Sequence, residues 1–372
     1  MTLIKRSQHN KLLKKYFLFT ILFGFVIFSL NILGAYPQLI NKYYTNTLYK
    51  DISIIIHPIT LLIPFSIGDF LYTLIIGLIV YTIICISKVM IKRNYFELKT
   101  LILKVILGVQ IFVSLFYLLW GLNYSRPPAG ELLGLRNITF STSELKDVTA
   151  SLIDSVNVSR KLLTQADLSQ SNKSIYIAAT KAIQTLSNNY GDFKTYNPGV
   201  KSSILTPLLN YLGTAGYFNP FTGEAQINGD MPVFNRPVVA CHEMSHQMGF
   251  GAEDEANFVG FLAGIGSHDH LLHYSAYQLA VEECMYALWQ KDSLINKDLK
   301  KRINKEVHND FIVERKYWIK YQSRINKISG NFYNNFLKAN KQPNGLKTYN
   351  NMVILIMAMY KTKNHFNKIQ MD

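Results

Sequence analysis

The segment "VVACHEMSHQMGFGAEDEANFVGFLA" (residues 238–263) places two histidines, an acid between them and three further acids in an otherwise apolar stretch. Residues four apart share one face of a helix, so His242 and His246 point the same way, one turn apart. Their ring nitrogens can bind one zinc ion, and Glu243 between them is placed to act as general base on a water. The segment therefore predicts an H-E-x-x-H zinc site on a helix.

The ends of this helix carry signals of their own. Asn235 is a suitable N-cap, Pro237 fits the first turn, and Gly249 fits the end. A catalytic zinc needs three protein ligands. On an unbroken helix, a carboxylate seven residues beyond His246 would lie roughly 10 Å further along the axis, too far to share the ion. Gly249 and Gly251 allow the chain to turn back, because glycine adopts positive φ without steric cost.

The acids after this turn are the candidates for the third ligand. We favour Glu253, because Asn257 lies four residues further on the same helical face and can hydrogen-bond a histidine ligand. Glu255 would point about 200° away from Glu253 around a helix. It stays open as an alternative ligand, as does a distant acid on a later helix, either Glu282 or Glu283.

The combination of "HEMSH" and "EDEAN" resembles the gluzincin type of zinc metallopeptidase, whose third ligand opens an E-x-x-x-D pattern. Asn257 stands where that pattern has aspartate, which keeps a hydrogen-bonding side chain at this position. The spacing is shorter than in most of that group and approaches the metzincin layout. Ala252 occupies the position of the third metzincin histidine, so that ligand set is absent.

Most of residues 36–290 resembles the DUF3810 family of bacterial membrane proteins. The resemblance rests on "PFSIGDFLY" (64–72), "WGLNYSRPP" (120–128), "YSAYQLA" (274–280) and the opening segment. It implies a membrane-anchored metallopeptidase and names no substrate.

The first third of the chain has the apolar composition of membrane-spanning segments. Charged residues make up only 17% of the chain, and none occurs in residues 16–41, 70–87 or 105–125. Each run approaches the roughly 20 apolar residues that cross a bilayer as a helix. The sequence therefore predicts three transmembrane helices, at about 16–36, 68–90 and 101–122.

A fourth apolar stretch, "ISIIIHPITLLIPFSIGD" (52–69), is interrupted by Pro58 and Pro64 and contains His57. We interpret it as an interfacial or re-entrant piece outside the membrane. Were it to span the membrane, the orientation of everything after it would be reversed.

Lysine and arginine in short loops set the orientation. The N-terminal 16 residues carry five of them, the loop after the second crossing four, and the loop after the first only Lys42 and Lys50. We expect a multi-pass protein of the cytoplasmic (inner) membrane, with its N-terminus in the cytoplasm and the chain after the third crossing outside. The net charge of +15 is compatible with an outer face against anionic lipid or cell-wall polymer. No nucleic-acid-binding motif is present, so nucleic acid is not an expected partner.

The outer part, residues 127–372, reads as one domain of helices and a single hairpin. Helices are expected at 142–163, capped by Thr142 or Ser143, at 173–191, 253–266 and 274–291, and in basic stretches such as 311–327. A short apolar segment at 349–361 is expected to pack as a helix rather than to cross the membrane. "TAGYFNPFTGEAQIN" predicts strands at 215–219 and 224–228 around a turn.

Other features near the motif have alternative interpretations. His268, His270 and His273 could bind a second metal or form a polar loop, and Tyr274 or Tyr277 could stabilise an oxyanion or simply pack. "GEAQIN" could be an edge strand on which an extended peptide docks, or a plain hairpin strand. Cys241 and Cys284 could pair only if the fold brings them together.

Together these features predict a mainly α chain: a membrane anchor (1–126) with three transmembrane helices, followed by an extracytoplasmic α+β zincin-like metallopeptidase domain (127–372). The expected cofactor is Zn²⁺, and the expected partners are the lipid bilayer and an unidentified peptide or protein substrate. The expected activity is peptide-bond hydrolysis with Glu243 as general base. The alternatives are a membrane sensor or scaffold with a regulatory or self-cleaving zinc site, and a zinc amidase acting on cell-wall material.

Overall fold

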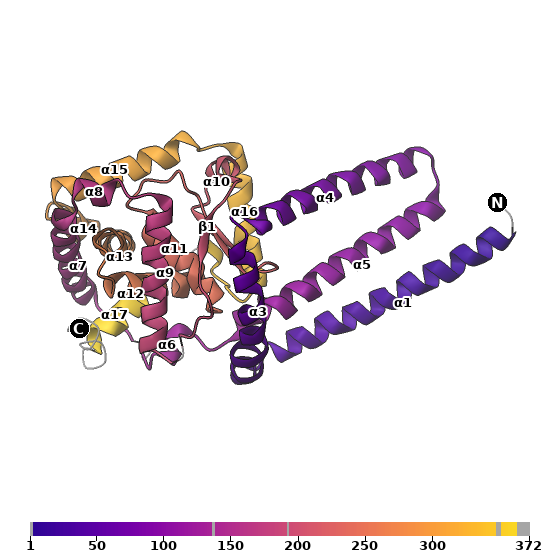
Figure 1. Cartoon of the computed structure of the whole chain (residues 1–372), viewed down its shortest axis with the longest axis horizontal. Helices are drawn as coiled ribbons and strands as arrows, with labels where there is room; N and C mark the ends of the chain where they lie inside the picture. Colours follow the sequence, from indigo (N-terminus) through magenta and orange to yellow (C-terminus); the bar gives the residue numbers. More distant parts are fainter. Residues whose placement is uncertain (1–2, 136–137, 192, 347–350, 363–372) are drawn as a thin grey trace. The chain divides into compact units, whose positions relative to one another are not determined.

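The computed structural model describes residues 3–135, 138–191, 193–346 and 351–362. Two compact units make up the chain (Figure 1). The membrane unit comprises Met1–Ile52 and Ile67–Arg126, and the site unit comprises Ser53–Ser66 and Pro127–Asp372.

Three long apolar helices form most of the membrane unit: α1 (Leu3–Leu33), α4 (Ile67–Ile91) and α5 (Tyr95–Leu119). Within the described residues, the stretches long and apolar enough to span a bilayer are Lys11–Leu33 and the whole of α4 and α5. The three predicted membrane helices are therefore present, although the third begins earlier and ends at Leu119 rather than 122. Short turns follow α1 and α5: α2 (Pro37–Leu39), the π-helix η1 (Ile40–Leu48) and the 3₁₀ helix η2 (Gly121–Ser125).

The fourth apolar stretch is shorter than the three candidate membrane spans and makes several contacts with the rest of the site unit. It forms α3 (Tyr49–Leu62), which from Ser53 onward belongs to the site unit. His57 is 2% exposed, and its Nδ1 lies 2.7 Å from the carbonyl oxygen of Tyr196. The Lys201 ammonium donates to the carbonyl oxygens of Thr60 (2.6 Å) and Phe65 (3.0 Å). These contacts are local to the site unit, and the sequence of the stretch alone did not reveal them.

A three-stranded sheet of order β1-β3-β2 lies in the site unit: β1 (Val200–Ser202), β2 (Gly216–Asn219) and β3 (Glu224–Ile227). The hairpin of β2 and β3 is antiparallel, with Phe218 opposite Ala225, and matches the predicted strands. The third strand, β1, was not predicted, and it pairs in parallel with β3. Of the two interpretations of "GEAQIN", the edge strand is excluded and the hairpin strand holds, because β3 is paired on both sides.

Helices surround this sheet. Ser141 caps α7 in a reciprocal capping box with Glu144, so the predicted cap at Thr142 or Ser143 is one or two residues late. The basic stretch at 311–327 is divided between two helices, α15 and α16, because the chain turns at residues 321–323. The helices of the site unit beyond α3 are α6 (Ala129–Leu132), α7 (Thr142–Leu162), α8 (Gln165–Leu168), α9 (Asn172–Asn189), α10 (Thr206–Leu212), α11 (Arg236–Gln247), α12 (Glu253–Ile265), α13 (His270–Lys291), α14 (Ser293–Lys300), α15 (Lys305–Lys320), α16 (Arg324–Ala339) and α17 (Met352–Lys361).

The core centres on α11, which packs against α9, α12, α13 and the sheet. Gly260 lets α12 approach α11 closely, since a Cβ there would lie 3.2 Å from the backbone nitrogen of His242. The C-terminal helix α17 is a packing helix, as predicted, with most of its apolar side chains buried. Cys241 and Cys284 are buried free thiols, so the possible disulfide does not form.

Candidate metal centre

The helix α11 carries both histidines of the motif to the interior. Pro237 lies in its first turn, as predicted, but Asn235 adopts helical φ and ψ and makes no capping hydrogen bond through its side chain. The residues from Ala240 to Gln247 are all buried. A sequence pattern that looks like a polar helical face is therefore a polar cluster inside the protein, where each polar group needs a partner.

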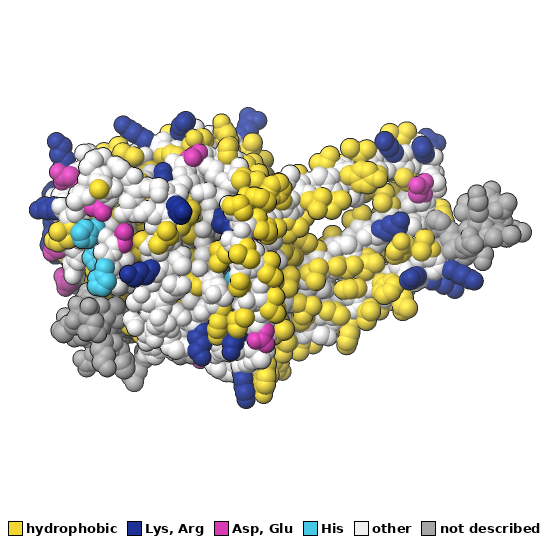
Figure 2. Space-filling model, in the orientation of Figure 1, with side chains coloured by type: hydrophobic (Ala, Val, Ile, Leu, Met, Phe, Trp, Pro, Cys, Tyr) yellow, Lys and Arg dark blue, Asp and Glu magenta, His cyan; other side chains and the backbone are white. Residues whose placement is uncertain are grey.

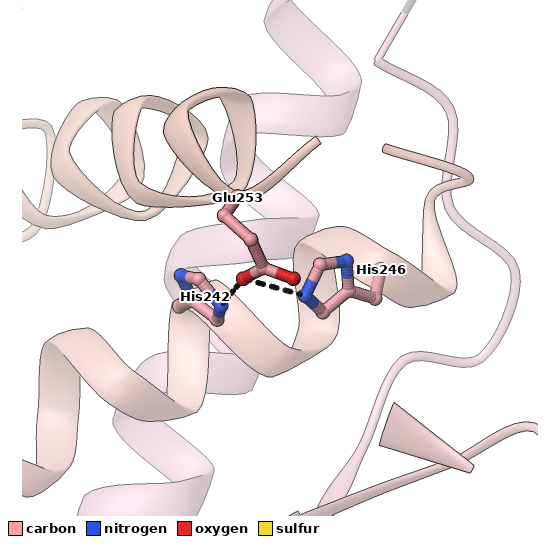
Figure 3. Close-up of side chains that lie close together, drawn as sticks. All are labelled: His242, His246 and Glu253. Carbon is pink, nitrogen blue, oxygen red and sulfur yellow. Dashed lines mark ion pairs between the residues drawn. The ribbon is translucent and has the colours of Figure 1, made fainter. Parts of the chain in front are cut away.

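The chain reverses directly after α11, as the glycines suggest. Gly249 has φ of +81°, in the left-handed region that favours glycine, whereas Gly251 is not among the residues with positive φ. Glu253 is the first residue of α12, and its side chain points back between the two imidazoles (Figure 3).

Three side chains converge on one point: His242, His246 and Glu253. Glu253 Oε2 lies 3.2 Å from His242 Nε2 and 3.7 Å from His246 Nε2. Tetrahedral coordination with bonds of about 2.0–2.1 Å requires ligand atoms about 3.3–3.4 Å apart. All three residues are buried, and among the described residues they form the one group that can hold a metal ion.

The hydrogen bonds on the far side of each ring fix which nitrogen faces Glu253. His246 Nδ1 lies 2.6 Å from the carbonyl oxygen of Phe250, which can only accept, so Nδ1 carries a proton. His242 Nδ1 lies 2.7 Å from Asn257 Oδ1 and donates in the same way. In the neutral rings, both Nε2 lone pairs then face a carboxylate oxygen. Acceptors this close repel one another unless a proton or a cation lies between them. A bound metal ion would be such a cation.

The charges of the three groups are strongly linked. Burial alone would lower the pKa of His246, but the Glu253 carboxylate raises it to about 9. Burial works against ionisation of Glu253, yet the two histidines hold its pKa well below its usual value. Glu253 is therefore a carboxylate at neutral pH, as a metal ligand must be.

Glu243 lies beside this group and is 4% exposed. Burial raises its pKa to about 7, an effect that His242 and His246 oppose and Glu253 strengthens. A carboxyl group with this pKa can both accept and release a proton near neutral pH. Gly216 of β2 leaves room for it, because a Cβ on Gly216 would lie 2.7 Å from Glu243 Oε1. In the sequence, this glycine is marked only by its place in the hairpin.

The C-terminal third of the chain also supports the site, which sequence reasoning missed. Tyr333 on α16 donates to Glu253 Oε1 at 2.6 Å, leaving Oε2 to face the histidines. The Gln342 amide accepts from the Glu253 backbone N–H (3.3 Å) and donates to the Gly251 carbonyl (3.3 Å). Gln247 ties the end of α11 to the carbonyls of Gly199 and Gly223. Tyr333 and Gln342 lie 80 and 89 residues from Glu253, so no short-range pattern pointed to them, and Gln247, next to His246, carried no signal of its own.

The other candidate ligands lie elsewhere. Glu255 accepts from the backbone N–H of Ala129 at 3.0 Å, outside the group of three. Glu282 and Glu283 lie on α13 and do not belong to that group either. The third ligand position suggested by the sequence is thus the one at which the structure places a carboxylate, Glu253.

The histidines and tyrosines after the motif serve other contacts. His270 and His273 lie in α13 rather than in a loop, and His273 Nδ1 lies 3.2 Å from Ser159 Oγ. His268, His270 and His273 form no metal-binding group among the described residues. The Tyr274 hydroxyl donates to Asp310 at 2.7 Å, and Tyr277 packs against His273 and Phe261. In this structure the Tyr274 hydroxyl proton is thus used in the bond to Asp310.

A family model described as a protein of unknown function (DUF3810) matches residues 44–357. The chain belongs to the DUF3810 family. The match begins at residue 44, slightly later than the range 36–290 on which the sequence resemblance rested, and extends past it to residue 357, so it includes Tyr333 and Gln342. No curated protein and no solved structure matches the chain.

Replacing Asn257 by alanine should weaken metal binding about 10–100-fold, because the His242 ring loses the acceptor that fixes its orientation. Asn257→Asp should retain binding, since a carboxylate oxygen can accept the same hydrogen bond. Metal affinity is measured by competition with a chromogenic chelator, with Asn296→Ala as a control distant in sequence. Equal affinities for Asn257→Ala and the control would show that this hydrogen bond does not support the site.

Proposed function

We propose that this DUF3810 protein is a membrane-anchored zinc peptidase. The observation that carries the proposal is the convergence of two imidazoles and one carboxylate, with Glu253 Oε2 3.2 Å and 3.7 Å from the two Nε2 atoms, and a second buried carboxyl group, Glu243, beside them. Two imidazoles with one carboxylate are characteristic ligands of catalytic zinc, whereas magnesium and calcium favour sites made of oxygen ligands. Three protein ligands leave a coordination position for a reactant.

Each residue has a distinct part in the proposed reaction. His242, His246 and Glu253 would hold Zn²⁺, which when bound acts as a Lewis acid that polarises a carbonyl and acidifies water. Glu243 accepts the proton of the attacking water and delivers it to the leaving amine. Burial raises the pKa of Glu243, which favours a group that can take up and release a proton. The hydrogen bonds from His242 to Asn257 and from His246 to Phe250 keep the rings aimed at one point.

We further infer that the site faces the outside of the cytoplasmic membrane. The N-terminal flank and the loop between α4 and α5 are richer in lysine and arginine than the segment after α1. With three crossings, the chain after α5 then lies outside. The substrate would be a peptide or protein in that compartment.

The test uses the full chain in nanodiscs with a peptide library, and mass spectrometry detects new chain ends. We expect many cleavages per protein molecule, loss of cleavage with a zinc chelator, and recovery when zinc is returned. Cleavage that is insensitive to the chelator would contradict the proposal, and so would no cleavage by zinc-loaded protein. A single cleavage of the chain itself would instead support the sensor, and release of cell-wall amides alone would support the amidase.

A further inference from the structure

One face of the site unit is apolar although it is exposed. It is made by α3, α10 and α16, and we call it the apolar face; hydrophobic side chains gather over α3 in Figure 2. Large exposed apolar patches on a folded protein usually mark a contact surface. Its exposed members are Ile54, Ile55, Ile59, Leu61, Leu62 and Phe65 from α3 and the residues after it, Ile204, Leu208 and Tyr211 in and before α10, and Ile325, Ile328 and Phe332 of α16.

Contacts inside the site unit make this face continuous. Lys201 of β1 holds the end of α3 through the carbonyl oxygens of Thr60 and Phe65, and the exposed Ile204 follows three residues later. The next helix, α10, packs against α16, and the rings of Tyr211 and Tyr321 are 5.5 Å apart. The exposed apolar residues therefore lie on elements that are linked to one another, α10 to α16 directly and α3 to the segment before α10 through Lys201.

The helix α16 has the composition of an amphipathic helix that lies in a membrane surface. Ile325, Ile328 and Phe332 recur at helical spacing, and Ile328 and Phe332 are 68% and 74% exposed. The exposed Arg324 and Lys327 lie beside this stripe, and the helix contains no aspartate or glutamate. Apolar residues flanked by basic ones suit the boundary between acyl chains and anionic headgroups.

Chain connectivity favours lipid over a soluble partner. Leu62, the last residue of α3, is 84% exposed, and the membrane-spanning helix α4 begins at Ile67. Five residues span at most roughly 18 Å, so this end of the face is tethered close to a bilayer. The chain itself therefore holds the apolar face near lipid, whereas a soluble partner would have to reach it by diffusion.

We infer that the apolar face of the site unit lies on the lipid surface of the membrane that holds the chain. The same helix connects this face to the metal centre: Phe332 is exposed on it, and its neighbour Tyr333 donates to Glu253. In combination with the proposed function, and only then, the substrates would be polypeptides held at the membrane surface.

The test labels single cysteines with an environment-sensitive fluorophore in the full chain, reconstituted in vesicles of phosphatidylcholine and phosphatidylglycerol. Cys85 is replaced by serine, while Cys241 and Cys284 are buried and stay unlabelled. The labelled positions are Ile328→Cys and Phe332→Cys, with Val158→Cys as the control. Val158 is an exposed apolar residue of α7, which lies at the opposite end of the site unit from α16 (Figure 1).

Spin-labelled lipid should quench the α16 labels by roughly twofold or more, because they lie at the acyl boundary, and should leave the Val158 label unquenched. Quenching at Ile328 and Phe332 no greater than at Val158 would overturn the inference. Disulfide cross-linking under mild oxidation between the unlabelled α16 cysteines of two chains, without lipid quenching of the labelled ones, would also overturn it, by identifying a second copy as the occupant. The same measurement on Glu253→Gln separates this inference from the proposed function, since lipid contact does not require the metal.

Discussion

Glu253→Gln is expected to remove bound zinc, whereas Glu255→Gln should retain about one zinc per chain. Glutamine keeps the size of the side chain and can still accept from Tyr333, but it removes the negative charge between the two imidazoles. A neutral amide is a poor ligand for zinc. We expect the loss in affinity to exceed the roughly 100-fold that marks the upper range for supporting residues. Metal content is measured by mass spectrometry on the purified full chain.

Glu255→Gln is a matched control, because it makes the same chemical change two residues away, where the carboxylate accepts from the Ala129 backbone. Thermal unfolding in the same detergent shows whether either variant fails to fold. Zinc retained by folded Glu253→Gln would remove Glu253 from the ligand set. Absence of zinc in the folded wild type, even after it is supplied, would remove the metal centre altogether and favour a scaffold.

Glu243→Gln should keep the zinc and lose at least about 100-fold in turnover, the lower end of what a general base contributes. Its carboxyl group is buried and lies against Gly216, and burial raises its pKa to about 7. An amide of the same shape fits that space and removes a buried titratable group, so the fold should not suffer. Turnover is measured on a peptide from the library that the wild type cleaves.

The comparison with Glu253→Gln makes the result specific. Both variants should be inactive, but only Glu243→Gln should contain zinc. Glu243→Gln with full turnover would show that another group moves the proton. Loss of both zinc and activity in Glu243→Gln would assign Glu243 to holding the metal rather than to proton transfer.

The sequence by itself determined the features that depend on neighbouring residues. Uncharged runs of bilayer length predicted the three membrane helices. Burying a charge in lipid is costly, so charged residues are scarce in the segments that cross it. The i, i+4 spacing of His242 and His246 placed both rings on one helical face, and Gly249 marked the reversal that brings Glu253 back. The hairpin of β2 and β3 followed from alternating residues around a turn. In each case, interactions between residues close in sequence determine the local structure.

The tertiary structure alone decided which distant groups meet. The strand β1 has only three residues and is formed by pairing with β3, so it is too short for a periodic pattern to predict it. Whether Glu253 or Glu255 faces the histidines depends on how α12 packs on α11 at Gly260. Tyr333 reaches Glu253 from 80 residues away. His57 and Lys201 connect α3 to the site unit, and the sequence of this stretch, interpreted as an interfacial or re-entrant piece, did not indicate these contacts. Such contacts arise only when the whole core packs, since their energy comes from burial and pairing between segments that no local pattern connects.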